Sequence, residues 1–413
     1  MGRRKAYAAD MATHSDVLVI GGGFAGLYAA KMAAHHRCSV TLVDTRGIQS
    51  FQPLLYQVAT GQLPVDVVDY PLTDLHDVNV VAAQVDSVDL TARVATLADG
   101  TTLTADYLVL ATGTHVNFFG VPGAEQFALP LYTSTDATRI KSRIQQLVEA
   151  NRDFTVVVIG AGATGVEFAG ALGDVINNAL PRTYPQFANV KVAVHVVDRG
   201  KVPVANMRLE SQQAVATDLT KAGVHPHFGR SVTQVRADGV DLDDGTSIDC
   251  DLVVWSGGIS ATSPQLTPAP ALGRGGRITI DPDLRITGND RVYCVGDTSI
   301  DSSTPLPQLG SVAKQQGIHA ARNIREQREG NEPKVFHYID LGEMVMIRYN
   351  QAAVEMGPTH AEVTGEPAFA MWLGLHAMLL PDSEDRKAAV HQWFEELRSG
   401  TVHFLPNNDT EDS

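Results

Sequence analysis

The sequence predicts an α/β protein built on two parallel, doubly wound sheets, and two observations support this fold class. The first is a pattern that occurs twice: a β-rich apolar run, then G-x-G-x-x-G, then a helix-forming stretch. It reads VLVIGGGFAGLYAA in residues 17–30 and VVVIGAGATGVEFAGAL in residues 156–172. The second is that similar later elements follow both copies in the same order. With 413 residues, of which 44% are hydrophobic, the chain can form two or three domains with sizeable cores.

The three glycines of each copy have separate tasks. The first permits the tight turn out of the strand, the second lets the backbone approach a pyrophosphate, and the third lets helix and strand pack closely. The helix N-terminus then offers free N–H groups and the positive end of its dipole to the anion. The glycines concerned are Gly21, Gly23 and Gly26 in the first copy, and Gly160, Gly162 and Gly165 in the second. We therefore interpret the pattern as two Rossmann-like dinucleotide-binding units; for one motif alone, a βα turn without a ligand is the alternative.

The repeat extends beyond the glycines. Residues 96–113 read TLADGTTLTADYLVLATG, and residues 241–258 read DLDDGTSIDCDLVVWSGG. In each, a DG turn lies between two strand-like segments, which is a strong β-hairpin signal. A strand of buried type follows and leads to Gly113 in the first half and to Gly258 in the second. Each half is therefore predicted to be a βαβ unit, then a β-meander, then a strand that returns to the parallel sheet.

An acidic residue is expected at the end of the second strand of each unit, where it receives ribose hydroxyls. CSVTLVDTR places Asp44 there, and VKVAVHVVDRG places Asp198 there after an insertion at residues 177–189. A carboxylate favours a free 2′-hydroxyl and repels a 2′-phosphate, so NADH is preferred to NADPH. The neighbouring Arg199 leaves some room for NADPH. For either acid, a solvated charge at a strand end is the alternative.

A third element completes the first nucleotide site. RVYCVGDTS, residues 291–299, is predicted to be a short strand that ends at Gly296 and Asp297. A carboxylate at such a strand end can reach the ribityl and phosphate region of a flavin dinucleotide, although a Gly-Asp pair alone is only a turn signal. Two dinucleotide sites in one chain fit electron transfer between a flavin and a nicotinamide.

Longer stretches resemble one family of flavoprotein reductases. FQPLLYQVATGQL, residues 51–63, is the most specific and resembles the flavin-domain signature of the type II NADH dehydrogenases (NADH:quinone oxidoreductases). Further similar stretches are VNFFGVPGAEQFALPL (116–131), TGVEFAGAL (164–172), PQLGSVAKQQG (307–317) and FHYIDLGEM (336–344). The resemblance runs from about residue 15 to about residue 375. It implies an NAD(P)H dehydrogenase with FAD, NADH and a quinone-type acceptor.

The motifs and the resemblance together assign the site residues. Those expected to hold FAD are Gly21, Gly23, Phe24, Ala25, Gly26, Asp44, Gln52, Val85, Ala111, Thr112, Gly113, Gly296, Asp297 and Val312. Those expected to hold NADH are Gly160, Gly162, Thr164, Gly165, Asp198 and Gly258. Glu167, Lys314 and Gln316 are the candidates for catalysis. Glu167 matches the family's acidic residue between the nicotinamide and acceptor pockets; its alternative is a first-turn helix acid that the dipole favours.

The acceptor side departs from the family. Gly310-Ser311 stands where the family usually has alanine-glutamine, and Lys314 stands where an apolar residue is usual. Lys314 is expected either to add positive charge beside the flavin or to be an ordinary surface lysine. MIRYNQAAVEM, from residue 346, replaces an expected isoleucine-glycine-arginine run. The expected acceptor is a quinone, and these departures favour the alternative of a specialised small molecule or dioxygen. A third alternative is an NADH-sensing flavoprotein with a stable reduced complex.

The three cysteines, Cys38, Cys250 and Cys294, form no C-x-x-C or similar close pair. Disulfide reductases and sulfide:quinone reductases need redox-active cysteines, so electrons are expected to pass from the flavin directly to the acceptor. Two of the three lie in strand-like apolar runs, where a buried, inert thiol is expected. None of the 14 histidines shows a metal-ligand spacing such as H-E-x-x-H, so no metal is assigned.

Domain organisation follows from these motifs. Residues 1–14 are interpreted as a disordered leader, because they are basic and polar without the apolar core of a secretory signal. Residues 15–119 and 285–329 are predicted to form a split FAD-binding domain, and residues 120–284 an inserted NAD(P)H-binding domain. Residues 330–413 are predicted to be a small α+β module that begins with short strands, VFHYI and MVMIRY.

The C-terminal module bears on partners and location. AFAMWLGLHAMLL, residues 368–380, is apolar but too short to span a bilayer. It is expected to pack as a core or dimer helix, with membrane contact as the alternative; a homodimer through this module is a further expectation. A net charge of −15 argues against nucleic acid. The expected location is cytoplasmic, either free or peripheral on the inner face of the membrane.

Overall fold

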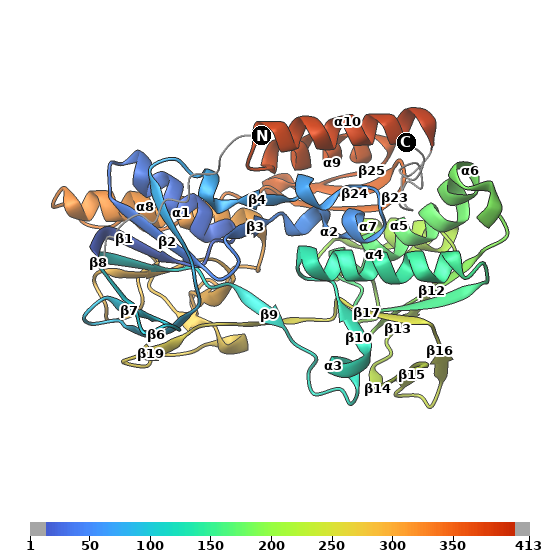
Figure 1. The fold of residues 1–413 in the computed structure, drawn as a ribbon, viewed down its shortest axis with the longest axis horizontal. Coiled ribbons are helices and arrows are strands. Elements are labelled where there is room, and N and C mark those ends of the chain that lie inside the picture. Colours follow the sequence, from blue (N-terminus) through green and yellow to red (C-terminus); the bar gives the residue numbers. More distant parts are fainter. Residues whose placement is uncertain (1–13, 401–413) are drawn as a thin grey trace, which may run out of the picture. The chain divides into compact units, whose positions relative to one another are not determined.

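The computed structural model describes residues 14–400, which form two compact units; most of the elements are labelled in Figure 1. Unit 1 combines the described part of Met1–Gln49 with Pro71–His115 and Ser260–Tyr338. Unit 2 combines Ser50–Tyr70 and Val116–Ile259 with the described part of Ile339–Ser413. The chain passes between the units at β3 (Ile48–Ser50), β4 (Asp69–Pro71), β9 (Thr114–Val116) and β18 (Ile259–Ala261), and once more after Tyr338. The predicted leader lies outside the described residues except for His14, which begins β1.

Unit 1 is built around one sheet whose strands run in the order β19-β6-β7-β8-β1-β2-β5, with β21 also paired to β8. The strands are β1 (His14–Ile20), β2 (Val40–Asp44), β5 (Val78–Ala82), β6 (Val85–Asp89), β7 (Val94–Leu97), β8 (Thr102–Leu110), β19 (Gln265–Thr267) and β21 (Val292–Cys294). A small pair, β20 (Ile278–Thr279) and β22 (Ser299–Ile300), completes the unit. Strands β5, β2, β1, β8 and β21 are mutually parallel, whereas β6, β7 and β8 form the predicted meander.

Two helices of unit 1, α1 (Phe24–His35) and α8 (Gly310–Arg328), pack against each other. Their contact is close because α1 buries only small side chains and Leu27, and because Gly317 of α8 lies against the α1 backbone at Ala25. Close helix packing of this kind fixes where the N-terminus of α8 lies within unit 1.

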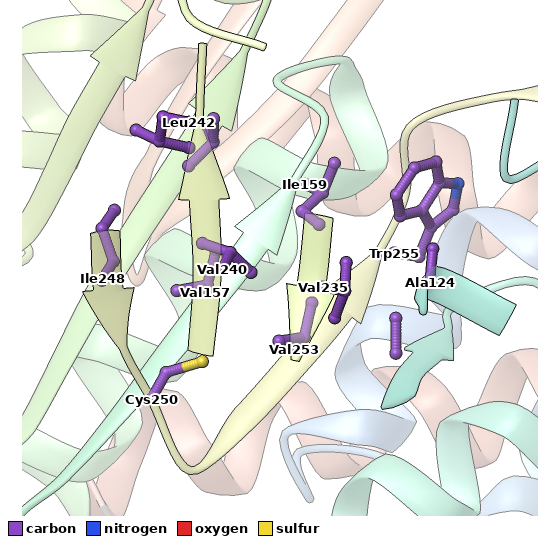
Figure 2. Packing of buried hydrophobic residues seen from close by; sticks show 12 residues of the cluster. Ala124, Val157, Ile159, Val235, Val240, Leu242, Ile248, Cys250, Val253 and Trp255 are labelled. Carbon is purple, nitrogen blue, oxygen red and sulfur yellow. The ribbon is translucent and has the colours of Figure 1, made fainter. Parts of the chain in front are cut away.

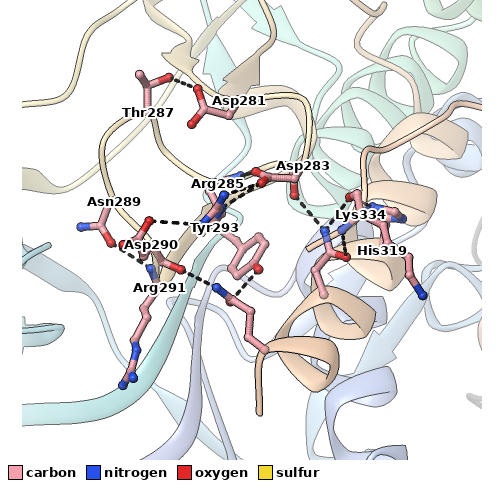
Figure 3. A network of polar contacts seen from close by, with 12 residues as sticks. Asp281, Asp283, Arg285, Thr287, Asn289, Asp290, Arg291, Tyr293, His319 and Lys334 are labelled. Atoms are coloured by element: carbon pink, nitrogen blue, oxygen red, sulfur yellow. Dashed lines mark hydrogen bonds and ion pairs between the residues drawn. The ribbon is translucent and has the colours of Figure 1, made fainter. Parts of the chain in front are cut away.

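A polar network holds the other half of α8 (Figure 3). The Asn323 side-chain amide donates to the carbonyl oxygens of Asp283 (3.1 Å) and Lys334 (2.9 Å). The Tyr293 hydroxyl donates to Gln327 Oε1 at 2.8 Å, and Arg285 pairs with Asp283 at 2.7 Å. Because these bonds join α8 to the loop before β21, the helix and the Gly-Asp turn after β21 are positioned together.

Unit 2 repeats the architecture with a second parallel sheet, in the order β10-β17-β11-β12-β13. Its strands are β10 (Ala128–Pro130), β11 (Phe154–Ile159), β12 (Val192–Asp198), β13 (Val224–Phe228) and β17 (Leu252–Trp255). The antiparallel meander consists of β14 (Val232–Arg236), β15 (Gly239–Leu242) and β16 (Ser247–Asp249). The helices are α2 (Leu55–Ala59), α3 (Ala124–Phe127), α4 (Ser134–Glu149), α5 (Ala163–Asp174), α6 (Leu180–Thr183) and α7 (Leu209–Lys221).

The meander of unit 2 is joined to its parallel sheet by a buried hydrophobic cluster (Figure 2). Strands β11 and β17 contribute Val157, Ile159, Val253 and Trp255, and the meander contributes mainly branched aliphatic side chains such as Val240. These β-branched residues fit a pleated surface that is covered on both faces. The cluster therefore holds the carboxyl ends of β11 and β17, where the second glycine motif and Gly258 begin.

The C-terminal module of unit 2 consists of the sheet β23 (Glu343–Arg348), β24 (Gln351–Met356) and β25 (Ala361–Gly365), followed by α9 (Glu366–Leu379) and α10 (Ser383–Ser399). Helix α9 packs on β24 and β25 and buries Ala368, Phe369, Trp372 and His376 along one face. The predicted strand at VFHYI is wrong: residues 335–339 have no regular structure, because Phe336 bonds instead to the carbonyl oxygen of Pro282 at 2.8 Å.

Burial of His376 predicts an acid limit to stability. Burial lowers the pKa of His376 to about 4, against 6.5 in an unfolded chain, while a 2.9 Å bond with the Trp372 carbonyl opposes the change. As pH falls from about 6.5 to about 4, the unfolded state binds a proton that the folded state does not bind. This lowers the free energy of unfolding by about 3 kcal/mol. Urea unfolding of His376→Gln should show a flatter pH dependence in this window. The exposed His391→Gln is the control, and an unchanged slope in His376→Gln would contradict the assignment.

The predicted fold class is confirmed: the protein is α/β, with two Rossmann-like units and an α+β C-terminal module. The compact units nevertheless differ from the predicted domain boundaries. Residues 260–284 belong to unit 1, because β19 adds to β6 and Thr262 donates to the Gly113 carbonyl at 3.1 Å. Residues 50–70 belong to unit 2.

Candidate active site

The first glycine turn has the shape that a dinucleotide phosphate requires. Gly21 has φ +99°, and a Cβ there would meet the carbonyl of Ala111, so only glycine fits. A Cβ at Gly26 would collide with the carbonyl of Gly21, which explains the close contact of α1 with the turn. A Cβ at Gly23, by contrast, would meet nothing within 4 Å. The second glycine therefore leaves its backbone accessible at the N-terminus of α1.

The second turn reproduces this arrangement in unit 2. Gly160 has φ +107°, and a Cβ there would come within 2.7 Å of the Ser256 carbonyl oxygen. A Cβ at Gly165 would collide with the Gly160 carbonyl, and one at Gly162 would meet nothing within 4 Å. Thr164 is exposed in the first turn of α5. Both turns thus present an open glycine at a helix N-terminus, as an anion-binding cradle needs.

The acid at the end of each second strand also shapes the turn, which the sequence did not reveal. Asp44 Oδ2 accepts the Gly22 amide at 2.8 Å, and its Oδ1 accepts the Arg46 amide at 2.9 Å. Asp198 Oδ2 accepts the Ala161 amide at 2.7 Å, and its Oδ1 accepts the Gly200 amide at 2.6 Å. Each carboxylate therefore ties the glycine turn to the loop after its own strand. The solvated strand-end alternative is not supported, because both acids are partly buried and bonded to backbone amides.

A cavity of about 490 Å³ opens beside the first turn in unit 1. Four of the predicted FAD residues line it: Gly21, Asp44, Val85 and Thr112. The Thr112 hydroxyl donates to the Thr262 carbonyl at 2.5 Å. Sequence reasoning missed the lining residues that come from the segment after β18, from Thr262 to Gln265, because no nucleotide-binding motif covers that segment. A volume of several hundred cubic ångströms is typical of a small-molecule site.

The Gly-Asp turn and α8 meet through one buried glutamine. Gln316 Oε1 accepts the amide of Gly296 at 2.7 Å, and the Gln316 side chain is 5% exposed. Ala25, predicted for FAD, packs against Gly296, while Val312 is buried on α8. The structure thus shows Gln316 positioning the turn; its predicted role in catalysis stays a prediction.

Asp297 lies at the same turn in an environment that disfavours its charge. Burial raises the pKa of Asp297 to about 6, and the positive charge of Arg277 opposes this rise. Arg277 is held by bonds to the carbonyl oxygens of Ser299 (2.7 Å) and Leu306 (3.3 Å). Arg277 was not among the predicted site residues, since it belongs to none of the motifs that the sequence contains.

Lys314 and Phe24 lie at the contact of α8 with α1. The Lys314 ammonium group lies 4.4 Å from the centroid of the Tyr28 ring, a distance typical of a cation–π contact. A Cβ added at Gly310, the first residue of α8, would lie 3.5 Å from the Phe24 ring. Lys314 is half-buried rather than freely exposed. Neither of the two expectations for Lys314 is decided by this contact.

The second turn borders a cavity of about 210 Å³ in unit 2, lined by Gly160, Asp198 and Gly257 among others. The aromatic ring of Phe119, 55% exposed, lies on Gly258, and Arg199 stands 5.9 Å from the centroid of that ring. Sequence reasoning named Gly258 and Arg199 but missed Phe119. Its position between them could not be predicted, because Phe119 comes from the loop after β9, which is distant in sequence from both Arg199 and Gly258.

Glu167 is buried in unit 2 and not exposed at a helix end. It lies beyond the first turn of α5, so the alternative of a first-turn acid is wrong. The amide of Met346 donates to Glu167 Oε1 at 3.1 Å. Burial raises the pKa of Glu167 to about 8, while the Met346 amide and the Trp372 side chain oppose the rise. Met346 and Trp372 come from the C-terminal module, and no motif identified them in advance.

Gln52 is the one predicted FAD residue that the structure places in unit 2. Its side-chain amide donates to the Tyr132 carbonyl at 3.5 Å. The surrounding signature, residues 51–63, buries Phe51, Leu54 and Tyr56 within unit 2, where Tyr56 donates to Met346 Sδ at 3.3 Å. This burial explains why the stretch groups with unit 2, contrary to the predicted domain boundary.

All three cysteines lie in the described residues and are buried free thiols. Burial raises the pKa of Cys250 to about 11 and also raises the pKa values of Cys38 and Cys294. Thiols in this state are protonated at neutral pH and are poor nucleophiles.

Neither a membrane span nor a metal centre is found within residues 14–400. No helix there is both long and apolar enough to cross a bilayer. In the same part of the chain, no three His, Cys, Asp or Glu side chains are grouped to hold a metal ion.

Comparison with known proteins decides the family. The sequence profile named pyridine nucleotide-disulphide oxidoreductase matches residues 15–317. The type II NADH:quinone oxidoreductase NdhA of Mycobacterium tuberculosis is 31% identical over 408 residues, which cover 91% of this chain and 86% of NdhA. The chain belongs to the type II NADH:quinone oxidoreductases of this larger family. The predicted family and the predicted class of enzyme, an oxidoreductase, are therefore confirmed.

Further comparisons agree with this family. The demethylphylloquinone reductase NdbB of Synechocystis is 26% identical, with 80% of this chain and 84% of NdbB covered. The solved structure of NDH2 from Plasmodium falciparum in complex with NADH has a TM-score of 0.87 at 16% identity, covering 95% of this chain and all of that one. At this identity the solved structure supports the fold alone.

The geometry of Asp198 predicts coenzyme preference in this type II NADH:quinone oxidoreductase. Removing the carboxylate in Asp198→Ala should lower the preference for NADH over NADPH, measured as the ratio of kcat/KM values, by at least about tenfold. The reason is that a 2′-phosphate no longer meets a negative charge, while Arg199 remains beside it. Asp243→Ala, an exposed acid elsewhere in unit 2, is the control. Unchanged selectivity in Asp198→Ala would refute the ribose role.

Proposed function

We propose that the protein is an FAD-dependent oxidoreductase that passes a hydride from NADH through FAD to a quinone-type acceptor, with no redox disulfide. One observation carries this proposal: two glycine cradles of the same shape, each with an accessible second glycine and each tied to a carboxylate at the end of the next strand. We assign the cradle of unit 1 to FAD because Gly296 and Asp297 complete it, and the cradle of unit 2 to NADH.

The residues of unit 1 fit FAD by their donors and by the space they leave. Gly23 and the N-terminus of α1 would receive the pyrophosphate, Asp44 would accept a ribose hydroxyl, and the cavity beside them would hold the remainder of the nucleotide. Gln316 keeps the Gly296 turn in place at 2.7 Å. FAD, when bound, supplies the redox chemistry, by accepting a hydride and returning two electrons to an acceptor.

We assign to Glu167 the holding of a proton near the acceptor. Because burial raises its pKa to about 8, the carboxyl group is largely protonated at neutral pH and has a proton to give. Reduction of a quinone consumes protons as well as electrons, so such a group is chemically suited to the second half of the reaction. Burial of the Glu167 side chain maintains this state, against the hydrogen bonds of the Met346 amide and the Trp372 side chain, which favour the charged form.

The acceptor side of the sequence departs from the family pattern at Gly310, Ser311 and Lys314. The names of the relatives, NADH:quinone oxidoreductase and demethylphylloquinone reductase, support a quinone. The alternative, a specialised small molecule or dioxygen, is favoured only by these departures. A short-chain ubiquinone, menadione and dioxygen should therefore be compared as oxidants of the NADH-reduced protein in stopped flow.

We expect one of the quinones to restore the flavin absorbance much faster than dioxygen. Slow return with every quinone would favour the alternative acceptor. Slow bleaching by NADH, followed by a stable charge-transfer band, would point instead to an NADH sensor.

Lys314→Ala should leave the rate of flavin bleaching by NADH unchanged and alter only the rate at which a quinone restores the flavin absorbance.

A further inference from the structure

Unit 2 contains a second cavity, of about 470 Å³, that the proposed function does not use. It lies between α4, the meander and the first residues of β17. None of its lining residues lines the dinucleotide cavity that contains Gly160 and Asp198. Residues at the start of β17 face it, whereas the dinucleotide cavity contains Trp255 from the end of the same strand. The two cavities are therefore distinct sites on one sheet.

One wall of this cavity carries two exposed arginines, Arg139 and Arg143, that form no ion pair among the residues that the structure describes. Arg139 and Arg143 stand four residues apart on α4, which places them on one face of the helix. Arg139 makes no hydrogen bond or ion pair with any residue between 14 and 400. Arg143 donates only to neutral oxygens, the Asp251 carbonyl (3.3 Å) and Gln146 Oε1 (3.4 Å).

The acids near the cavity are already paired. The Asp251 carboxylate, which lines the cavity, is bound by Arg152 at 2.6 Å and by the Thr155 amide at 3.0 Å. Arg236, the third cationic lining residue, forms ion pairs with Asp238, Asp241 and Asp249. Two like charges at this helical spacing repel each other and destabilise the helix unless an anion lies between them.

The floor of the cavity is apolar. Cys250, Leu252 and Val253 line it and are each at most 9% exposed. Cys250 and Val253 belong to the hydrophobic cluster of Figure 2, so the floor is part of a rigid core. Arginine pairs bind planar oxyanions by parallel N–H bonds, and an apolar floor suits a flat carbon skeleton.

We propose that this cavity binds a small anionic ligand, consisting of a carboxylate or phosphate group on an apolar body. The oxyanion lies between the guanidinium groups of Arg139 and Arg143, and the apolar body lies on Leu252 and Val253. The site is separate from the NADH cradle of unit 2, so its occupancy does not require NADH.

Binding to the flavin-loaded full chain tests this proposal, with benzoate and phenyl phosphate as probes and benzyl alcohol as the neutral analogue. Isothermal titration should show saturable binding of at least one anion and weaker binding of benzyl alcohol. Arg139→Gln combined with Arg143→Gln should weaken the anion at least about tenfold, because each charge-assisted bond contributes to affinity. Arg274→Gln combined with Arg322→Gln removes the same charge at exposed positions of unit 1 and should change little.

The outcomes separate cleanly. Loss of binding in the α4 double variant, but not in the control, supports the site. If benzoate binds and phenyl phosphate does not, the natural ligand is a carboxylate, and the reverse result indicates a phosphate. Equal binding in both double variants, or no binding of either anion to the parent protein, overturns the proposal. Unchanged near-ultraviolet circular dichroism of the variants shows that they remain folded.

Discussion

Glu167→Gln is expected to become more stable relative to the parent protein as pH rises. The folded pKa of about 8 lies above the ordinary value of 4.5, so between these values the unfolded chain releases a proton that the folded chain retains. The stability contributed by this group is therefore complete below pH 4.5 and is lost as pH rises to about 8. The full loss is about 4–5 kcal/mol of the free energy of unfolding. Glutamine does not titrate, so the Glu167→Gln variant does not undergo this loss.

Urea unfolding of both proteins from pH 5 to pH 9 measures this difference. The exposed Glu149→Gln controls for loss of a charge on a helix of the same unit. A constant difference between Glu167→Gln and the parent across this range would show that the carboxyl is not desolvated. If the proposed proton role is also right, the pH profile for quinone reduction loses its limb near pH 8, whereas bleaching by NADH does not change.

Gly317→Ala is expected to abolish FAD binding. A Cβ at this position would collide with the Ala25 carbonyl and come within 3.1 Å of the Ala29 amide nitrogen, both parts of the α1 backbone. The α1 backbone cannot rotate away as a side chain could, so α8 must move away from α1. This movement costs about 1–3 kcal/mol or more of folding stability. The shift also moves Gln316 from the Gly296 amide and disorganises the turn that contains Asp297.

Gly374→Ala is the matched control, because Gly374 is also helical but a Cβ there would meet nothing within 4 Å. It should retain its flavin and gain up to about 1 kcal/mol from the better helix propensity of alanine. Flavin content per chain and the thermal midpoint report both effects. Full flavin content in Gly317→Ala would mean that the contact of α1 with α8 does not support the site.

The glycine turns, the meanders and the returning strands could be predicted from sequence because each depends on local chemistry repeated twice. Gly21 and Gly160 show this most clearly, since the motif determines both their backbone conformation and their close contacts. The positions of Asp44 and Asp198 were likewise predictable, because each acid stands directly at the end of an apolar run that reads as a strand. What the pattern did not show is that Asp44 and Asp198 also bind the amides of their own turns.

Features that depend on contacts between distant segments could not be predicted. Glu167 owes its raised pKa to burial, and the two groups that oppose the rise, the Met346 amide and the Trp372 side chain, follow it by more than 170 residues. The stretch at residues 51–63 resembled a flavin signature, yet its aromatic side chains are buried in unit 2. Periodicity reveals that a side chain is buried but not which segment covers it.

The central claim is that one chain binds FAD and is reduced by NADH, and anaerobic titration of the purified protein with NADH tests it most directly. We predict a yellow protein whose flavin absorbance bleaches stoichiometrically with added NADH, much faster than with NADPH, and returns when menadione is added. A protein that contains no flavin and takes up none when FAD is supplied, or whose bound flavin is not reduced by NADH, would contradict this account.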